Sequence, residues 1–208
     1  MLPCRSPETR KKLAQEYEIK PIAHVRLLNG QTRKSCTKDL ITDSYYCFSY
    51  RRKNGTESGT FICGTYAANH FLELINHPKL PLFDPLVSET TRAGAKSESC
   101  GNDNDKEKWH PAARQLDNAI NLLVVCWDLK EVNHVLQEIK TELLMTKNRA
   151  PYPRWVKAVN TIISRDRQGR TLQQMIEELR KNNKIRHFDF GLLNEILLKN
   201  NVEKSFYG

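Results

Sequence analysis

Residues 44–64 decide the fold, and they read SYYCFSYRRKNGTESGTFICG. Two runs rich in aromatic and β-branched side chains, 44–52 and 59–64, flank an Asn-Gly pair at 54–55. Asn-Gly between such runs is the strongest short-range signal of a β-hairpin. The apolar residues of the segment 66–75 that follows have helical spacing. The sequence therefore predicts a strand–turn–strand–helix unit, called ββα below.

Upstream of this unit the sequence predicts one helix and one strand. Pro7 stands at the first position of a basic helix that ends near Glu18, and Ser6 is placed to cap it. Residues 22–28 alternate loosely between apolar and polar side chains, which indicates a strand. The N-terminal part is therefore expected to mix helix and strand.

Downstream the composition changes twice. Residues 88–108 read SETTRAGAKSESCGNDNDKEK and have no apolar periodicity, so we expect a linker or a long exposed loop there. Beyond it, apolar residues recur at helical spacing. The predicted helices are Pro111–Trp127, one begun by the pair Asp128 and Glu131, Arg154–Ser164, one capped by Thr171 and Gln174, and Gly191–Leu198 capped by Asp189. Short connections between such helices indicate a bundle.

The predicted fold class is therefore α+β. A small N-terminal module containing the β-hairpin and helix occupies residues 1–87, with zinc as its candidate stabilising ion. Residues 88–108 form the domain boundary, and a C-terminal helical bundle occupies 109–208.

The hairpin brings two cysteines close together. With Gly55 at the centre of the turn, Cys47 lies opposite Cys63, whereas a two-residue Asn-Gly turn shifts the pairing by one. His70 on the following helix and Cys36 upstream of the first strand complete a set of three thiolates and one imidazole. Such a set suits tetrahedral Zn²⁺. We therefore predict a structural zinc site at Cys36, Cys47, Cys63 and His70.

Three alternatives to a structural zinc site remain open, and one of them is a redox or disulfide role for the cysteines. The spacing lacks the paired C-x2–4-C motif of zinc fingers, so Cys47 and Cys63 could be small buried residues of the sheet. A ββα unit with a metal also resembles the HNH type of nuclease, with Asn69-His70 on the helix. The first strand, however, has no histidine to act as the general base of a metal-dependent nuclease.

Positive charge is the second functional signal. The chain has 33 Lys+Arg against 24 Asp+Glu, a formal net charge of +9, and residues 147–186 hold 11 basic and three acidic residues. Basic groups of this density can neutralise phosphates. The predicted nucleic-acid contacts are Arg51, Arg52, Lys53, Arg154, Lys157, Arg165, Arg167, Arg170, Arg180, Lys181, Lys184 and Arg186.

Several classes of protein are excluded or disfavoured. No stretch approaches the ~18 apolar residues of a membrane span, and the N-terminus has no apolar leader. We therefore expect a cytoplasmic protein whose six cysteines are free thiols or metal ligands. No G-x-S-x-G, H-E-x-x-H or P-loop motif is present, which disfavours an enzyme.

The expected function is that of a non-catalytic accessory or regulatory protein that binds nucleic acid. An acidic surface on another protein would match the same positive charge. The alternative function is therefore an adaptor subunit that binds a larger complex through the helical bundle.

Overall fold

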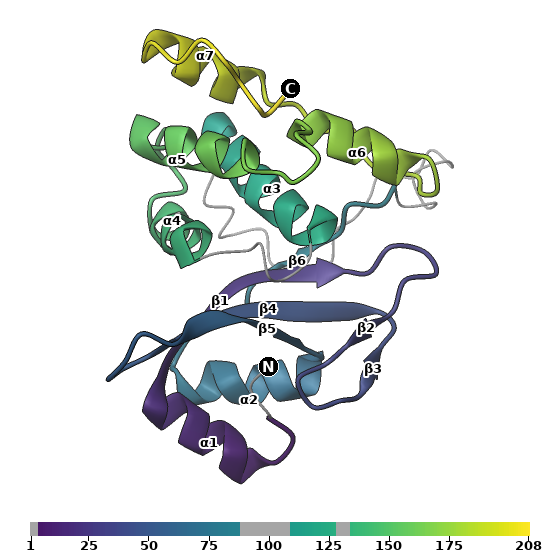
Figure 1. Ribbon diagram of the computed structural model, residues 1–208, viewed down its shortest axis with the longest axis vertical. Helices are drawn as coiled ribbons and strands as arrows, with labels where there is room; N and C mark the ends of the chain where they lie inside the picture. Colours follow the sequence, from purple (N-terminus) through teal and green to yellow (C-terminus); the bar gives the residue numbers. More distant parts are fainter. Residues whose placement is uncertain (1–3, 88–108, 128–133) are drawn as a thin grey trace, which may run out of the picture.

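The computed structural model describes residues 4–87, 109–127 and 134–208, which form three layers (Figure 1). The middle layer is a four-stranded sheet. Its strands, in spatial order, are β5 (Ser58–Cys63), β4 (Ser44–Arg52), β1 (Tyr17–Arg26) and β6 (Leu82–Phe83). A separate ribbon is formed by β2 (Arg33–Lys34) and β3 (Leu40–Ile41). The prediction of a mixed α+β fold is confirmed.

Helices cover both faces of the sheet (Figure 1). One face carries α1 (Pro7–Glu16) and α2 (Thr65–Leu74). Against the other face lie α3 (Pro111–Cys126) and α4 (His134–Met145). The outer helices are α5 (Pro153–Ile163), α6 (Leu172–Arg180) and α7 (Gly191–Lys199). No helix of the described segments is long and apolar enough to cross a membrane.

The ββα unit forms as the sequence predicts. β4 and β5 are antiparallel, their last pair is Arg51 with Ser58, and α2 begins directly after Gly64. The unit is not an isolated module, however. β4 also pairs along its length with β1, and β1 pairs in parallel with β6, so the hairpin is one edge of a larger sheet.

A bulge in β1 determines which side chains face which layer. The register between β1 and β4 shifts between Pro21 and Ala23, which leaves Ile22 as an extra residue. Tyr17 and Ile19 pack with α1 and α2, whereas Ala23 and Val25 pack with the helical bundle. Side chains alternate strictly along a regular strand, so odd-numbered positions would all face the same side of the sheet. The extra residue reverses the alternation, and the odd-numbered positions before and after it therefore face opposite layers of helices.

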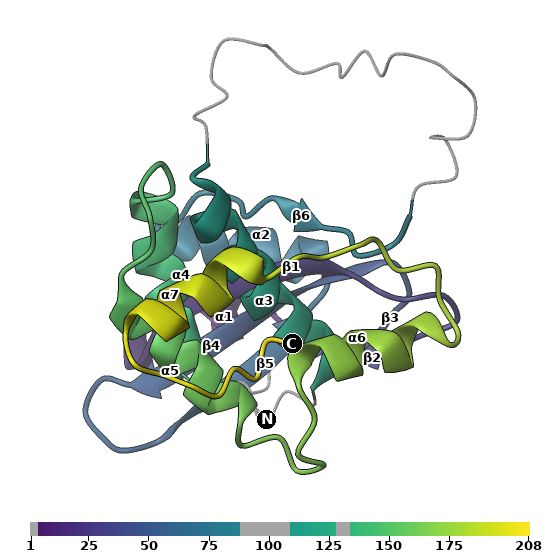
Figure 2. The same ribbon diagram turned by 90° about the horizontal axis from the view of Figure 1, so that it is seen from above.

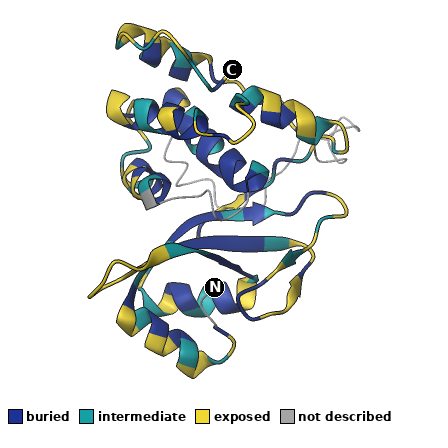
Figure 3. Ribbon diagram, in the orientation of Figure 1, coloured by how far each residue is buried: buried dark blue, intermediate teal, exposed yellow. Residues whose placement is uncertain are grey.

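Two hydrophobic cores result, one on each side of the sheet. The larger core joins β1, β4 and β5 to helices α3–α7, and the smaller joins the same strands to α1 and α2. Figure 3 shows most of β1, the middle of β4 and most of α3 buried, whereas α6 and α7 expose their outer faces. The helical bundle therefore packs directly on the sheet, through the larger of the two cores.

Two of the predicted helix caps form as the sequence indicates. Ser6 accepts a hydrogen bond from the backbone N–H of Thr9, and Thr171 and Gln174 form a full capping box. The prediction that Asp189 caps α7 is wrong, because the N-cap is Phe190, whose side chain makes no capping hydrogen bond. Asp189 stands one residue before it and accepts the backbone N–H of Gly191 at 3.0 Å. The predicted linker at 88–108 and the pair Asp128 and Glu131 lie outside the described residues.

Candidate functional site

Cys47 and Cys63 lie on adjacent strands but on opposite faces of the sheet. Cys47 pairs with Ile62, and Tyr46 pairs with Cys63, so the register is centred on the Asn-Gly turn. A shift by one residue sends a side chain to the other face. Cys47 packs in the core under the helical bundle, and Cys63 packs in the core beside α1 and α2. The prediction that both thiolates bind one ion is therefore wrong.

Cys36 is not a free ligand either, because it is bonded to Cys4. The two residues form a disulfide with their Cα atoms 5.7 Å apart, and both side chains are buried. This corrects the expectation that all six cysteines are reduced thiols or metal ligands. It also removes one of the arguments for a reducing compartment.

His70 serves a structural contact between helices. Its Nδ1 accepts a hydrogen bond of 2.8 Å from Nε of Arg10 on α1. The four predicted zinc ligands are therefore not brought to one point. Within residues 4–87, 109–127 and 134–208, no group of three or more His, Cys, Asp or Glu side chains is arranged to hold a metal ion.

The free thiols that the structure describes have the chemistry of core residues. Burial raises the pKa of Cys63 to about 12 and that of Cys126 to about 12, and it raises the pKa of Cys47 further. These thiols are protonated at neutral pH, whereas the thiolate is the form that binds metals and acts as a nucleophile. The alternative interpretation of Cys47 and Cys63 as buried free thiols is confirmed.

Several of the predicted basic contacts have partners within the fold. Arg51 pairs with Glu18 at 2.9 Å on the neighbouring strand β1. Arg180 pairs with Glu177, and Lys53 donates to the carbonyl oxygen of Ala14 at 3.1 Å. The charge at these positions is therefore partly compensated before any ligand binds.

Arg170 organises the loop between α5 and α6. It donates to Asp166 through Nε at 3.0 Å and Nη2 at 2.9 Å, and it also pairs with Glu178. Asp166 in addition accepts the indole N–H of Trp127 at 2.9 Å. Hydrogen bonding to Arg170, and then to the other donors, holds the pKa of Asp166 well below its usual range. This network fixes the loop to α3.

One helix face carries three basic side chains, of which Arg154 and Arg165 are exposed and Lys157 is half-buried. Arg154, Lys157 and Arg165 follow one another at intervals of three and eight residues along α5 and just past its end, which places them on one side of the helix. Beside them Tyr152 is 53% exposed, and the Arg154 guanidinium lies 5.2 Å from its ring centroid. We call Tyr152, Arg154, Lys157 and Arg165 the α5 surface.

The remaining basic residues lie elsewhere. Arg167 is exposed in the α5–α6 loop, close to the α5 surface. Lys181, Lys184 and Arg186 follow the far end of α6, whose nine residues span about 14 Å. Arg51 and Arg52 end β4, and Lys53 begins the turn that leads to β5. This turn projects from the sheet layer, away from the α5–α6 loop (Figure 2). The predicted nucleic-acid contacts therefore fall in three separate places.

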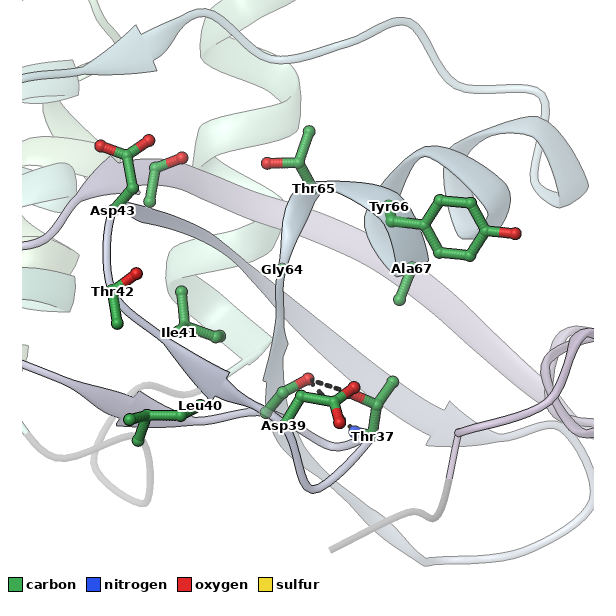
Figure 4. Close-up of a pocket in the computed structure, with 12 residues that line it drawn as sticks. Thr37, Asp39, Leu40, Ile41, Thr42, Asp43, Gly64, Thr65, Tyr66 and Ala67 are labelled. Atoms are coloured by element: carbon green, nitrogen blue, oxygen red, sulfur yellow. Dashed lines mark hydrogen bonds between the residues drawn. The ribbon is translucent and has the colours of Figure 1, made fainter.

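A hollow of about 310 Å³ lies between the β2–β3 ribbon and the start of α2. In Figure 4 its wall shows hydroxyl and carboxylate groups, and the ring of Tyr66 points away from them. The hydroxyl of Thr37 lies 2.8 Å from Asp39 Oδ2 and 2.9 Å from Ser35 Oγ. Ser35, Thr37 and Asp39 thus bond to one another, which leaves these three side chains fewer donors and acceptors for a ligand.

A cleft of about 270 Å³ lies where the β6 edge of the sheet meets the helical bundle. Its floor is a closed polar cluster. Lys140 of α4 donates to Asp117 Oδ1 and, at 3.0 Å, to Asn121 Oδ1, while Asn121 Nδ2 donates to Asp117 Oδ2 at 3.0 Å. The Lys140 side chain is only 5% exposed. Burying an ammonium without such partners would be costly, and these hydrogen bonds offset the loss of water.

Two arginines at the same cleft have no ion-pair partner among the described residues. Arg114 comes from α3 and Arg186 from the segment after α6, and both are exposed. Arg186 lies over the rings of Phe83 (5.8 Å) and Phe188 (5.4 Å). Desolvation is the largest effect on the pKa of Arg186 and lowers it. Attraction to Asp84 raises this pKa, and repulsion from Arg114 lowers it further. Two cations therefore border one cavity.

Among the cleft residues only Arg186 was predicted as a site residue. The others come from distant parts of the chain, including His24, Arg114 and Lys140, and no spacing motif connects them. One signal was present in the sequence. Lys140 stands four residues after Leu136 and three before Leu143, which places a charged residue on the apolar face of its helix. A lysine in that position predicts a buried side chain that pairs with its ammonium group.

Comparison with known proteins assigns nearly all of the chain to one family. Searches of the curated proteins and of the solved structures found no match. A family model described as "Uncharacterised conserved protein UCP028583" matches residues 4–207. That range runs from the disulfide-bonded Cys4 to the buried Tyr207 and so includes both layers of helices, the sheet and the cleft. The protein belongs to this family of uncharacterised conserved proteins.

Proposed function

We propose that this protein is a non-catalytic accessory protein that binds nucleic acid in the cytoplasm. The observation that carries the proposal is the α5 surface, where three basic side chains share one side of a helix with an exposed tyrosine. The formal net charge of +9 supports it, since a basic protein attracts polyanions over long distances.

The α5 surface offers the two elements that unspecific nucleic-acid binding needs. Arg154, Lys157 and Arg165 extend over about 16 Å of helix axis, a length that reaches several successive phosphates. Lys157 and Arg165 have no ion pair among the described residues. Arg154 is 72% exposed and lies 3.6 Å from the exposed Glu142, a surface pair that contributes little and can be exchanged for phosphate.

Tyr152 would add a stacking platform next to these charges. Its ring is half exposed, and the T-shaped contact with Trp155 (4.7 Å between centroids) holds it in place. A base that stacks on an aromatic side chain gains roughly 1–3 kcal/mol in any sequence context. The proposed mode is therefore contact with phosphates and a base face rather than sequence readout.

The test is fluorescence anisotropy with single-stranded DNA and RNA oligonucleotides over a series of salt concentrations. Three contacts predict an affinity loss of roughly 10- to 20-fold between 50 and 200 mM salt. The triple variant Arg154→Glu, Lys157→Glu and Arg165→Glu should lose binding. A matched triple variant away from α5 makes the same change in net charge at three exposed lysines: Lys12→Glu on α1, Lys34→Glu on β2 and Lys79→Glu after α2.

Loss of binding in the α5 variant but not in its control supports the proposal. Equal losses in both variants would show a general charge effect and would overturn the α5 surface as the site. If the wild-type protein binds no oligonucleotide at 50 mM salt, the proposed function is wrong, and the adaptor alternative takes its place.

A further inference from the structure

We infer that the cleft between the β6 edge and the helical bundle is a binding site for a phosphomonoester group, the terminal phosphate of a nucleotide. This inference does not depend on the α5 surface. The cleft is lined from a different set of segments, and its cations are Arg114, Lys140 and Arg186.

The charges around the cleft do not cancel. Asp117 is occupied by Lys140 and Asn121, and Asp84 is paired with Arg26 at 3.2 Å. Both carboxylates are therefore engaged with basic groups. Arg114 and Arg186 have no such partner among the described residues, so the cavity carries an excess of positive charge. Asp84 attracts Arg186 from a distance, but its carboxylate forms its ion pair with Arg26, so both guanidinium groups keep donors for an anion in the cavity.

A phosphomonoester fits this arrangement better than a carboxylate. It carries close to two negative charges at neutral pH and offers three acceptor oxygens, so it can satisfy two guanidinium groups at once. Lys140 can add to them from the floor. An ammonium has three N–H donors, and Asp117 and Asn121 account for two of those of Lys140.

The rest of the cleft suits an aromatic carrier of the phosphate. Trp109, Pro81 and Phe83 contribute apolar surface to the walls, and half-buried His24 contributes a second ring system. The volume of about 270 Å³ lies just below the ~300 Å³ at which small-molecule sites usually begin, so the cleft has room for at most one nucleotide. That nucleotide can be free, or it can be the 5′-phosphorylated end of a nucleic acid.

Isothermal titration calorimetry separates these sources with four probes: adenosine 5′-monophosphate, adenosine, a 5′-phosphorylated oligonucleotide and the same oligonucleotide with a 5′-hydroxyl. Arg114→Gln and Arg186→Gln should each weaken binding of the phosphorylated probes by about tenfold or more. Arg149→Gln removes an exposed arginine outside the cleft and should leave binding unchanged. Because Arg114 and Arg149 are exposed and form no ion pair with a described residue, their variants should keep the wild-type melting temperature. Arg186→Gln also loses the contact with Phe83 and Phe188, so its binding is measured at a temperature where it is fully folded.

The outcomes are distinct. Binding of adenosine 5′-monophosphate but not adenosine supports a site for the free nucleotide. Preference for the phosphorylated oligonucleotide alone supports a site for nucleic-acid ends. Equal binding of phosphorylated and unphosphorylated probes, or no binding of either phosphorylated probe, overturns the inference. Since the α5 variant leaves the cleft intact, it should still bind the phosphorylated probe by this site, so the two proposals fail separately.

Discussion

Nε of Arg10 donates a hydrogen bond of 2.8 Å to Nδ1 of His70, and this contact links α1 to α2. Arg10 is only 2% exposed, and its Nη1 donates to the carbonyl oxygens of Cys4 (3.0 Å) and Arg5 (2.9 Å). The guanidinium is thus held by neutral acceptors. Removing one of them leaves a buried charged donor without a partner, which is costly.

His70→Ala should therefore destabilise the protein by about 1–3 kcal/mol. Urea denaturation followed by circular dichroism measures the change, and His187→Ala on the exposed surface is the control. The loss should be the same with and without a metal chelator. A loss that disappears in the presence of chelator would instead make His70 a metal ligand.

The Cys4–Cys36 disulfide closes a loop with a sequence separation of 32 residues. In the chain-entropy model a loop of this size contributes about 3–4 kcal/mol by restricting the unfolded chain. Cys36→Ser should therefore lower the free energy of unfolding by this amount under oxidising conditions. Under reducing conditions the variant and the wild type should differ little. A wild-type protein whose stability is unaffected by reductant would argue against the disulfide.

Asp166 should make stability depend on pH in the acid range. Its pKa in the folded protein is lowered, chiefly by Arg170, so its stabilisation is fully present above the unfolded-state pKa of about 4. The stabilisation is lost as the pH falls from there toward the folded-state pKa. Asp166→Asn should cost about 2–3 kcal/mol at pH 7 and flatten the acid dependence. Asp43→Asn, at an exposed position, should change neither; a similar loss in both variants would refute the special role of Asp166.

Cys47 and Cys63 should resist alkylation in the folded protein. Both thiols are buried, and burial raises their pKa, so little thiolate is present at pH 7–8. Labelling with iodoacetamide, followed by peptide mass spectrometry, should modify them only after unfolding in guanidinium. Rapid modification of either residue in the native protein would contradict its placement in the core.

Local signals in the sequence predicted the local structure well. The Asn-Gly turn, the Ser6 cap and the capping box of Thr171 and Gln174 were recognisable because each depends on residues only a few positions apart. The bulge at Ile22 was not recognisable. It exists because β1 has to serve two cores, and that requirement arises only when both layers are in place.

The zinc prediction shows why short distances along a hairpin are not sufficient. A shift by one residue leaves Cys47 and Cys63 close together but reverses the face of one thiol. Cys36, for its part, is bonded to Cys4, across a separation of 32 residues that no turn geometry predicts. The nature of the site therefore depended on register and on a long-range contact.

The sequence by itself determined the class of the fold, the ββα hairpin, the helical C-terminal part and the excess of positive charge, because periodicity, turn chemistry and composition are local properties. Tertiary structure alone decided which charges remain available. Arg170 forms an ion pair with Asp166. Arg114 and Arg186 stand 72 positions apart in the sequence but border one cleft, and neither forms an ion pair with another described residue. The physical reason is that compensation of a charge depends on distance in space, which the chain settles only when its layers pack.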